Sequence, residues 1–499
     1  MARMRTVALV LLLAAAVGDA RQEADNPRLH SLFGDGMVLQ RDRPCPVWGS
    51  AAAGEKISVS LNGQTKSAKA GADGRWSVTL DAMAAGGPFE MTVTGKTRQT
   101  VKDVLVGEVW LATGGSNMAM PLKEAQIAQT EPDDSPVSMR RFFVVPKRWS
   151  EKPERDVAAS WRSDRSETVA DVSATAYFFS RELRKRLKVP VGILQASVDD
   201  SSLYTWISKA AFADSAALRR ATFYQQLQQG EFEQAHATWE GRVRRAAEAR
   251  KRGEKPPDPG LEPANNFGVS GHHGGMISPL AGVAMRGAIL YQGEAEFFQG
   301  PRYRVLLDGL IKSWRTDWGR DFPVGWVQLP GYGAPSEAAT ESALPRFRQA
   351  QAESLAIPGT GMVVTIDLGE GDRIRPRNKE EVGRRLAVWA DSQVFGSKEI
   401  YSGPMYDSSV IDGRTIRIKF KNLGGGLQMK GDRLTGFSIA SAFRLFVPAK
   451  AVIEGDTVVV SSETYEWPTA VRYAWSDNPQ CSLINREGFP ACPFRTDSW

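Results

Sequence analysis

Apolar and polar residues alternate in short runs in the first part of the chain, from about Leu29 to Lys102. Ile57–Leu61 and Trp76–Leu80 are two such runs, and glycine-rich and Asn-Gly turns separate them. Alternation places every second side chain on one face of a strand, and Asn-Gly pairs favour tight hairpins. The pattern predicts a small β-sandwich over residues 29–103.

A different pattern begins near Val104, where short apolar runs alternate with helical or glycine-rich segments. The predicted strands are Val104–Ala112, Val191–Ala196, Ala284–Tyr291, Val324–Leu329 and Met362–Ile366. The predicted helices between them include Ala174–Lys188, Tyr303–Trp314 and Asn378–Ala390. Apolar strands that alternate with helices are typical of a parallel sheet covered by helices. Residues 104–400 are therefore predicted to form an α/β domain.

Two segments depart from this alternation. Residues 208–263 are rich in Arg, Glu, Gln and Ala and poor in large apolar residues, which predicts a helical insertion on the surface of the α/β domain. After about Tyr401 the alternating runs return, as in Thr415–Phe420 and Ser438–Phe446. The last segment, 401–499, is therefore predicted to be a second β-rich region.

The first twenty residues have the pattern of an export signal. Arg3 and Arg5 precede the apolar run Val7–Val17, and the small residues of Gly18–Ala20 follow it. The run is shorter than the roughly 20 apolar residues that a membrane-spanning helix needs. We expect residues 1–20 to be a cleaved signal peptide, the mature protein to be periplasmic or extracellular, and the chain to have no membrane span.

Composition and charge exclude several classes of protein. With 42% hydrophobic and 24% charged residues the chain is of ordinary globular composition. The net charge is +6, but the basic residues are scattered among acidic ones, which argues against a nucleic-acid partner. Three cysteines and four histidines are too few to suggest a metal site, and no other cofactor is implied. In an exported chain the short spacing of Cys481 and Cys492 favours a disulfide between them, leaving Cys45 as a buried thiol.

Six segments, taken in order, resemble the sialate O-acetylesterase family of carbohydrate esterases. They are Leu32–Gln40, Gly107–Met118, Gly287–Glu294, Phe322–Leu329, Pro376–Leu386 and Gly488–Asp497. Together they extend over nearly the whole mature chain. The resemblance implies an SGNH-hydrolase type of α/β fold and the removal of O-acetyl groups from sialic acid or other glycans by a serine nucleophile.

The resemblance places the nucleophile at Ser116, in the turn Gly115-Ser116-Asn117 that follows the predicted strand ending at Ala112. A strand-to-helix turn exposes a hydroxyl group at the carboxyl end of a sheet, where backbone N–H groups can stabilise an oxyanion. Serine is also a common helix cap, so the turn alone leaves both roles open.

The histidine that the family uses as general base is absent. The family's Asp-x-x-His-Pro motif reads Asp372-Arg-Ile-Arg375-Pro here. An arginine stays protonated and has no acceptor nitrogen, so Arg375 cannot take a proton from Ser116. His272 or His273 could serve as a substitute base, supported by Glu294 or Asp372.

Other positions of the implied site are replaced as well. Asp199 and Asp200 stand where the family has two glycines, one of which serves the oxyanion hole, and Gly115 stands where it has a glutamine. In the block Gln292–Glu296, Glu296 replaces an asparagine. A carboxylate at Asp199 would oppose the negative charge that builds up during ester hydrolysis. The replacements predict an acidic pocket that contains one arginine.

Three functions fit this pattern. The first is an O-acetylesterase in which Ser116 acts with a substitute base. The second is a glycoside hydrolase that uses Asp199 with Glu294 or Glu296, which requires a carboxylate separation of roughly 5 to 9 Å. The third is a glycan-binding protein without activity, because the missing base is a costly loss. In each case the expected partner is a glycan, either sialylated or acetylated.

Overall fold

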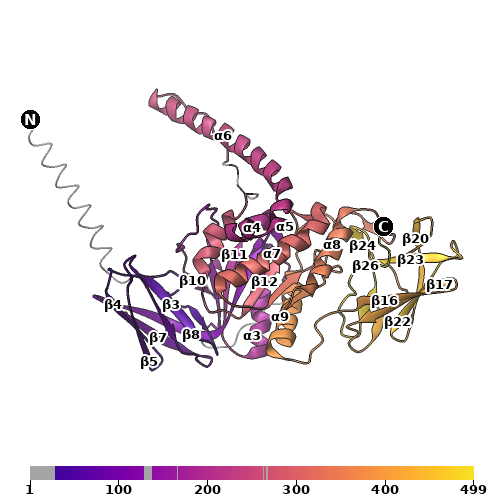
Figure 1. Cartoon of the computed structure of the whole chain (residues 1–499), viewed down its shortest axis with the longest axis horizontal. Helices are drawn as coiled ribbons and strands as arrows, with labels where there is room; N and C mark the ends of the chain where they lie inside the picture. Colours follow the sequence, from indigo (N-terminus) through magenta and orange to yellow (C-terminus); the bar gives the residue numbers. More distant parts are fainter. Residues whose placement is uncertain (1–27, 128–137, 166, 262, 264, 266–267) are drawn as a thin grey trace, which may run out of the picture.

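The structure is a computed structural model that describes residues 28–127, 138–165, 167–261, 263, 265 and 268–499, with residues 223–229 described by their backbone only. An N-terminal β unit, a central α/β unit and a C-terminal β unit follow one another along the long axis of the molecule (Figure 1). The predicted fold class, an α/β core with β-rich regions on both sides, is confirmed. The predicted signal peptide lies outside the described residues.

The central unit is built on a parallel sheet in the order β9-β11-β8-β12-β13-β15, with β10 added antiparallel to β9. The strands are β8 (Arg98–Gly114), β9 (Arg140–Val144), β10 (Trp161–Ser163), β11 (Val191–Ser197), β12 (Gly287–Tyr291), β13 (Val324–Val327) and β15 (Thr360–Val363). All the strands predicted between residues 104 and 366 are present. Their nearly continuous burial explains why they read as unbroken apolar runs.

Strand β8 belongs to two units at once. Its first half pairs antiparallel with β7 (Gly86–Thr94) and its second half pairs parallel with β11 and β12. The predicted boundary between residues 103 and 104 therefore falls inside a strand. The other strands of the N-terminal unit are β1 (Arg28–Leu29), β2 (Val38–Gln40), β3 (Cys45–Ser50), β4 (Lys56–Leu61), β5 (Gln64–Lys69) and β6 (Arg75–Leu80).

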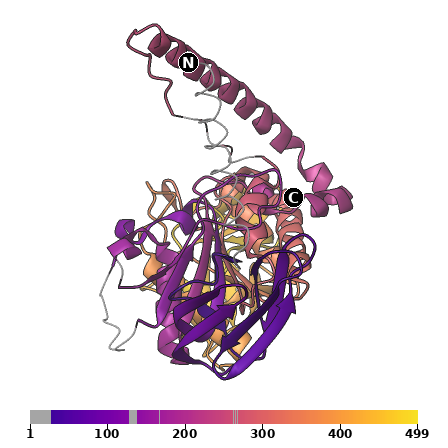
Figure 2. The same ribbon diagram turned by 90° about the vertical axis from the view of Figure 1, so that its left-hand side faces the viewer.

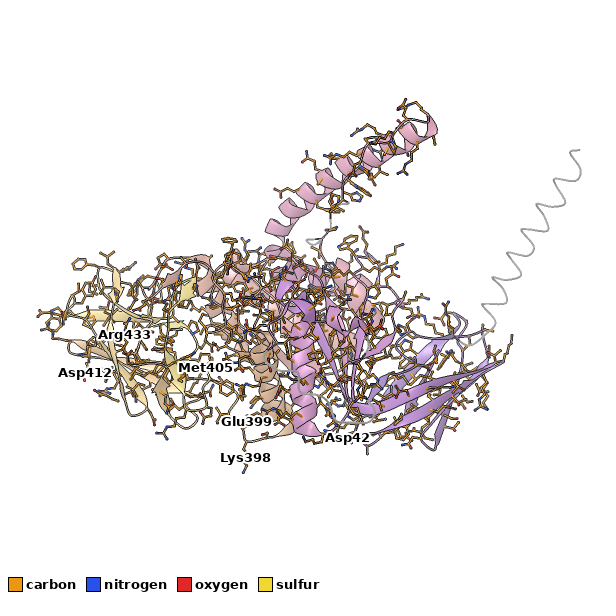
Figure 3. The ribbon with its side chains drawn as sticks, turned by 180° about the vertical axis from the view of Figure 1, so that it is seen from behind. Asp42, Lys398, Glu399, Met405, Asp412 and Arg433 are labelled. Carbon is orange, nitrogen blue, oxygen red and sulfur yellow. The ribbon has the colours of Figure 1, made fainter. Side chains whose placement is uncertain are left out.

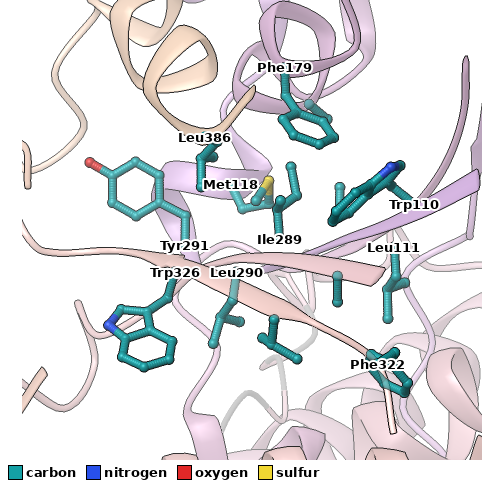
Figure 4. Close-up of a cluster of buried hydrophobic side chains, with 14 of the residues drawn as sticks. Trp110, Leu111, Met118, Phe179, Ile289, Leu290, Tyr291, Phe322, Trp326 and Leu386 are labelled. Carbon is teal, nitrogen blue, oxygen red and sulfur yellow. The ribbon is translucent and has the colours of Figure 1, made fainter. Parts of the chain in front are cut away.

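Helices cover both faces of the central sheet. Helices α3 (Ala174–Leu187) and α9 (Lys379–Phe395) pack together on one face, and α7 (Gly300–Trp318) and α8 (Ala343–Glu353) pack together on the other. Figure 4 shows Phe179 of α3 and Leu386 of α9 above the sheet, and Trp326 and Phe322 below it. The ring of Phe179 contacts that of Trp110 edge-on, with the ring centroids 5.2 Å apart.

The segment from residue 209 to residue 251 forms three helices, α4 (Lys209–Asp214), α5 (Ala216–Ala221) and α6 (Phe223–Lys251). Helix α5 packs on α7, whereas α6 extends away from the body of the molecule (Figures 1 and 2). The polar composition of this segment follows from that exposure. Within the described residues, no helix has the length and apolar character needed to cross a membrane.

The C-terminal unit has two four-stranded antiparallel sheets, in the orders β16-β17-β22-β21 and β20-β19-β23-β26, and a short antiparallel pair of β18 (Leu427–Met429) with β25 (Leu483–Asn485). Their strands are β16 (Met405–Asp412), β17 (Thr415–Lys421), β19 (Phe437–Ser441), β20 (Phe446–Pro448), β21 (Lys450–Glu454), β22 (Thr457–Ser461), β23 (Pro468–Tyr473) and β26 (Phe494–Arg495). Figure 3 shows Met405, Asp412 and Arg433 on this unit, with Lys398 and Glu399 on the segment that leads to it from α9. The short strands β14 (Pro335–Ser336) and β24 (Asn478–Pro479) pair and join this unit to the central one.

The predicted disulfide between Cys481 and Cys492 is wrong, because all three cysteines are free thiols. The Sγ atom of Cys492 accepts a hydrogen bond from Nε2 of Gln328 at 3.5 Å, and the thiol of Cys481 lies beside the hydroxyl of Tyr473. Burial raises the pKa of both thiols to about 11. Short spacing in the sequence suggested a pair, but each side chain has a different partner in the fold.

Candidate active site

Ser116 lies just beyond the carboxyl end of β8, as the first residue of the short helix α2 (Ser116–Ala119). Strand β8 lies between β11 and β12. The chain crosses to one side of β8 to form β11 and to the other side to form β12, so the strand order reverses at β8. Open α/β sheets bind ligands at the carboxyl end of such a switch point. The Oγ atom accepts a hydrogen bond of 2.9 Å from the backbone N–H of Asp200, and no side-chain bond caps the helix. The hydroxyl of Ser116 therefore faces the β11 loop and does not serve as a helix cap.

The backbone of Asp200 is in the left-handed region, with φ at +55°. Glycine adopts this conformation without strain, and aspartate is among the few other residues that tolerate it. The backbone N–H of residue 200 is thus directed at Ser116 although the side chain is that of an aspartate. Burial and the charge of Asp199 both raise the pKa of the Asp200 carboxyl group.

Arg375 lies at the mouth of the site and is paired with acids. One guanidinium nitrogen is 3.6 Å from the carboxylate of Asp199, and another is 4.0 Å from the carboxylate of Glu124. About a third of the Arg375 side chain is exposed, at 37%. The arginine therefore brings a positive charge to the same loop that carries Asp199 and Asp200.

Asn117 is the centre of a buried hydrogen-bond network beneath Ser116. Its backbone N–H and its Nδ2 both donate to Oε1 of Glu294 at 2.7 Å, and Nδ2 also donates to the carbonyl of Ile374 at 3.0 Å. The Nζ atom of Lys379 donates to Oδ1 of Asn117 and to the carbonyl of Pro376, each at 2.6 Å. Asn117 thus fastens the ends of β8 and β12 to the loop that carries Arg375.

Lys379 was not among the residues that the sequence singled out for the site. It is fully buried, and this burial lowers its pKa to about 7. Lys379 is the first residue of α9, directly after the cap Asn378. A lysine is unfavourable there because of the helix dipole, and that unusual position is the signal that could have identified it.

Gln292 and Glu296 hold the loop after β11 in place. Oε1 of Glu296 accepts from the N–H of Leu203 at 2.6 Å, and Oε2 accepts from Nε2 of Gln292 at 3.2 Å. Nε2 of Gln292 also donates to the carbonyl of Ser201 at 2.7 Å. Glu296 is fully buried, which raises its pKa to about 7. These contacts fix the segment that presents the N–H of Asp200 to Ser116.

Gly115 lies against two of these side chains. A Cβ atom at this position would be 3.0 Å from Oε2 of Glu294 and 3.1 Å from Oε1 of Gln292. Both oxygens are buried and have no hydrogen-bond partner in the described part of the chain. Burial raises the pKa of Glu294. A larger residue in place of Gly115 would require both side chains to move.

A small pocket opens beside this network. Glu294 forms part of its wall, and the rest is apolar or aromatic: Phe297, Leu329, Pro330, Tyr332, Leu344 and Ile374. Ile374 is adjacent to Arg375 in the chain and accepts the hydrogen bond from Asn117. The pocket therefore shares the loop that carries Arg375.

Known proteins resemble this chain over nearly its full length. No protein-family model matches it. A crystal structure of a carbohydrate acetylesterase from Xanthomonas citri is 34% identical, with a TM-score of 0.79, over 95% of this chain and 100% of that one. This chain belongs to the sialate O-acetylesterase family.

Mammalian relatives that bear the family name agree with this assignment. The sialate O-acetylesterase of Homo sapiens is 26% identical over 520 residues, which is 94% of this chain and 92% of the human protein. That of Rattus norvegicus is 27% identical over 545 residues, which is 98% of each chain. By this resemblance the protein is a carbohydrate esterase, in the class of carboxylic ester hydrolases.

The histidines of this esterase do not take the place of the family's base. Nδ1 of His272 is 2.8 Å from Oγ1 of Thr205, and burial lowers the His272 pKa to about 4. Nε2 of His273 is 2.7 Å from Oδ2 of Asp317. Helix α7 begins just after the loop that follows β12 and runs antiparallel to the strands, so its last residues lie near the amino ends of the strands. Asp317 is the second-last residue of this helix. His273 is therefore at the edge of the sheet opposite Ser116.

The other two histidines and Asp372 also lie outside the network around Ser116. His30 contacts Asp156, and His236 lies on α6. All four histidines are in the described part of the chain, and none of them is hydrogen-bonded to Ser116. Asp372 is exposed on the loop before α9. We expected Glu294 or Asp372 to support a histidine base, but the ring nitrogens of His272 and His273 contact Thr205 and Asp317 instead.

Proposed function

We propose that this protein is an exported carbohydrate O-acetylesterase with an SGNH-type fold and Ser116 as its nucleophile. The observation that carries the proposal is the hydroxyl of Ser116, which lies at the switch point of the parallel sheet and 2.9 Å from the backbone N–H of Asp200. The export signal expected at residues 1–20 supports a role on glycans outside the cytoplasm.

In the proposed reaction, Oγ of Ser116 attacks the carbonyl carbon of an O-acetyl group. The carbonyl π electrons move to its oxygen, and the N–H of Asp200 is close enough to donate to that oxyanion. When the tetrahedral adduct collapses, the bond to the sugar oxygen breaks and the acetyl group stays on Ser116. Water then attacks the acetyl-serine, and acetate leaves as the serine hydroxyl is restored.

The proton acceptor that we propose is the carboxylate of Asp200. Its backbone already contacts Ser116, and its raised pKa makes it a better proton acceptor than an ordinary aspartate. The proton from Oγ passes to Asp200, then to the departing sugar oxygen, and the attacking water supplies the proton that Ser116 regains. Arg375 contributes no acceptor, but its charge offsets that of Asp199 beside the developing oxyanion.

The contacts of the buried acids favour an esterase over a glycoside hydrolase. Both oxygens of Glu296 accept hydrogen bonds and the residue is fully buried, while Oε1 of Glu294 accepts two from Asn117. These two carboxyl groups hold loops together, whereas a glycosidase needs acids that flank a bound sugar bond. As substrate we propose an acetylated glycan, either a sialic acid or another acetylated sugar.

The experiment is an assay of acetate release from a panel of acetylated glycans and from an activated acetyl ester. The wild type is compared with Ser116→Ala, Asp200→Asn and the control Asp372→Asn, which changes an exposed acid outside the network. We expect both Ser116→Ala and Asp200→Asn to lose at least tenfold, while Asp372→Asn keeps its activity. Release of sugars without acetate would support the glycosidase, and glycan binding without turnover would support an inactive binding protein.

A further inference from the structure

The C-terminal unit carries three large apolar side chains that are almost fully in solvent. Phe443 is 83% exposed, Leu445 is 68% exposed and Trp467 is 75% exposed. Phe443 and Leu445 lie in the turn between β19 and β20, and Trp467 directly precedes β23. Clustered exposed rings of this size are uncommon on a protein surface and mark binding sites when they gather in one place.

The strand register brings these residues together. Ser441 at the end of β19 is paired with Pro468 at the start of β23, so Trp467 is next to the turn that carries Phe443 and Leu445. Tyr465 fastens the two segments, because its hydroxyl donates a hydrogen bond of 2.9 Å to the carbonyl of Leu445. We call Phe443, Leu445, Tyr465 and Trp467 the aromatic tip.

Along the chain, a charged residue lies between the two members of the aromatic tip on each segment. Arg444 lies between Phe443 and Leu445, and its guanidinium is 5.2 Å from the ring centre of Trp499. Glu466 lies between Tyr465 and Trp467 and is 3.0 Å from Arg414. A sugar ring has the matching chemistry, since one face presents C–H groups that pack on an aromatic ring while its hydroxyls bind charged groups at the edge.

The exposed area is too small for a stable protein partner. A Phe or Trp side chain buries roughly 150–250 Å² when enclosed, so the three exposed side chains offer about 400 Å². A stable protein interface needs about 800 Å² from each partner. A polysaccharide chain needs only a few exposed rings, and Phe443 and Trp467 are two such rings on neighbouring segments.

We propose that the aromatic tip binds the polysaccharide from which the Ser116 site removes acetyl groups. The identity of this ligand rests on the proposed function, although binding itself needs no catalysis. Strands β20 and β23 lie in the C-terminal unit, on the side of the central unit away from the N-terminal one (Figure 1). The tip therefore holds the enzyme on an extended or insoluble substrate and leaves the chemistry at the active site unchanged.

The test is depletion of the full-length protein from solution by insoluble acetylated xylan, by chitin and by mucin-coated beads. We expect the wild type to bind at least one of them and a Phe443→Ala/Trp467→Ala variant to bind at least fivefold less. The matched control is Ile411→Ala, which removes an apolar side chain that is 56% exposed on the other sheet, and it should bind like the wild type. Since these side chains are in solvent, the thermal midpoint of both variants should match that of the wild type.

Two further measurements separate this proposal from the proposed function. Hydrolysis of a soluble activated acetyl ester should be the same in the Phe443→Ala/Trp467→Ala variant as in the wild type, and Ser116→Ala should bind the polysaccharide normally. The proposal is overturned if the wild type binds none of the three materials or if the double variant binds equally well. A wild-type dimer that the double variant disrupts would assign the tip to self-association instead.

Discussion

The guanidinium of Arg375 lies 3.6 Å from the carboxylate of Asp199. By the family resemblance, each of these side chains stands where a residue of the catalytic centre is expected, and the two side chains contact each other. The sequence alone indicated that Asp199 would oppose an oxyanion, but the ion pair offsets that charge. Because both side chains are partly exposed, at 37% and 49%, the pair is weak in water and open to substrate.

The first prediction concerns the lost histidine. In an Asp199→Gly/Arg375→His variant, an imidazole replaces a group that cannot accept a proton, and the carboxylate of Asp199, which Arg375 had offset, is removed with it. We expect kcat/KM on an activated acetyl ester to rise at least tenfold, which is a modest part of what a positioned base supplies. The gain should disappear when Ser116→Ala is added. No gain at any pH above 7 would show that residue 375 is not at the position of the base.

The second prediction concerns pH. The charge of Asp199 raises the pKa of Asp200, so its removal should lower that pKa. If Asp200 must be ionised to accept the proton, the acid limb of the kcat/KM profile of Asp199→Asn should move to lower pH. Asp372→Asn serves as the control and should keep the wild-type limb. An unchanged limb in Asp199→Asn would remove Asp200 from the role of base.

The third prediction separates the network from the nucleophile. Asn117→Ala leaves the buried groups of Glu294 and Lys379 without their shared partner, and such a loss costs about 3 kcal/mol of the free energy of unfolding. Ser116→Ala in the same turn should keep the wild-type stability while losing activity. Denaturant unfolding of both variants measures this contrast. Equal stability of Asn117→Ala and the wild type would contradict the network.

The fourth prediction concerns stability and the buried acid Glu296. Burial raises its pKa from 4.5 to about 7, so between these values the folded protein holds a proton that the unfolded chain has released. The free energy of unfolding of the wild type should therefore fall relative to Glu296→Gln as the pH rises from 4.5 to 7. At about 1.4 kcal/mol per pH unit the difference amounts to about 3 kcal/mol. Parallel stability curves for the two proteins would show that Glu296 does not titrate in this range.

Much of the fold, and several of the residues that meet around Ser116, could be predicted from the sequence. The apolar runs in the sequence predicted the central strands, because buried parallel strands need apolar side chains on both faces. The turn at Ser116 and the replaced positions Asp199, Asp200 and Arg375 were visible as departures from the family's motifs. Their meeting in space follows from the carboxyl ends of parallel strands, which gather at one edge of a sheet.

Other features depend on tertiary contacts, which the local sequence pattern does not predict. Lys379 acquires its role only because the loop before α9 folds over Asn117. His273 was a candidate base by its position in the sequence, but the fold directs its ring to Asp317 at the far end of α7. Cys481 and Cys492 are close in sequence, yet their partners are Tyr473 and Gln328. For Lys379, His273 and Cys492 the deciding contact is with a residue from a distant segment.

The measurement that tests the central claim most directly is the mass of the enzyme during turnover. The protein is mixed with an activated acetyl ester, quenched in acid within the first turnovers, digested and mapped by mass spectrometry. We predict one acetyl group on the peptide that contains Ser116, and none on that peptide in Ser116→Ala. Acetate release with no acetylated Ser116 peptide, or with the acetyl group on another residue, would contradict the assignment of Ser116 as the nucleophile.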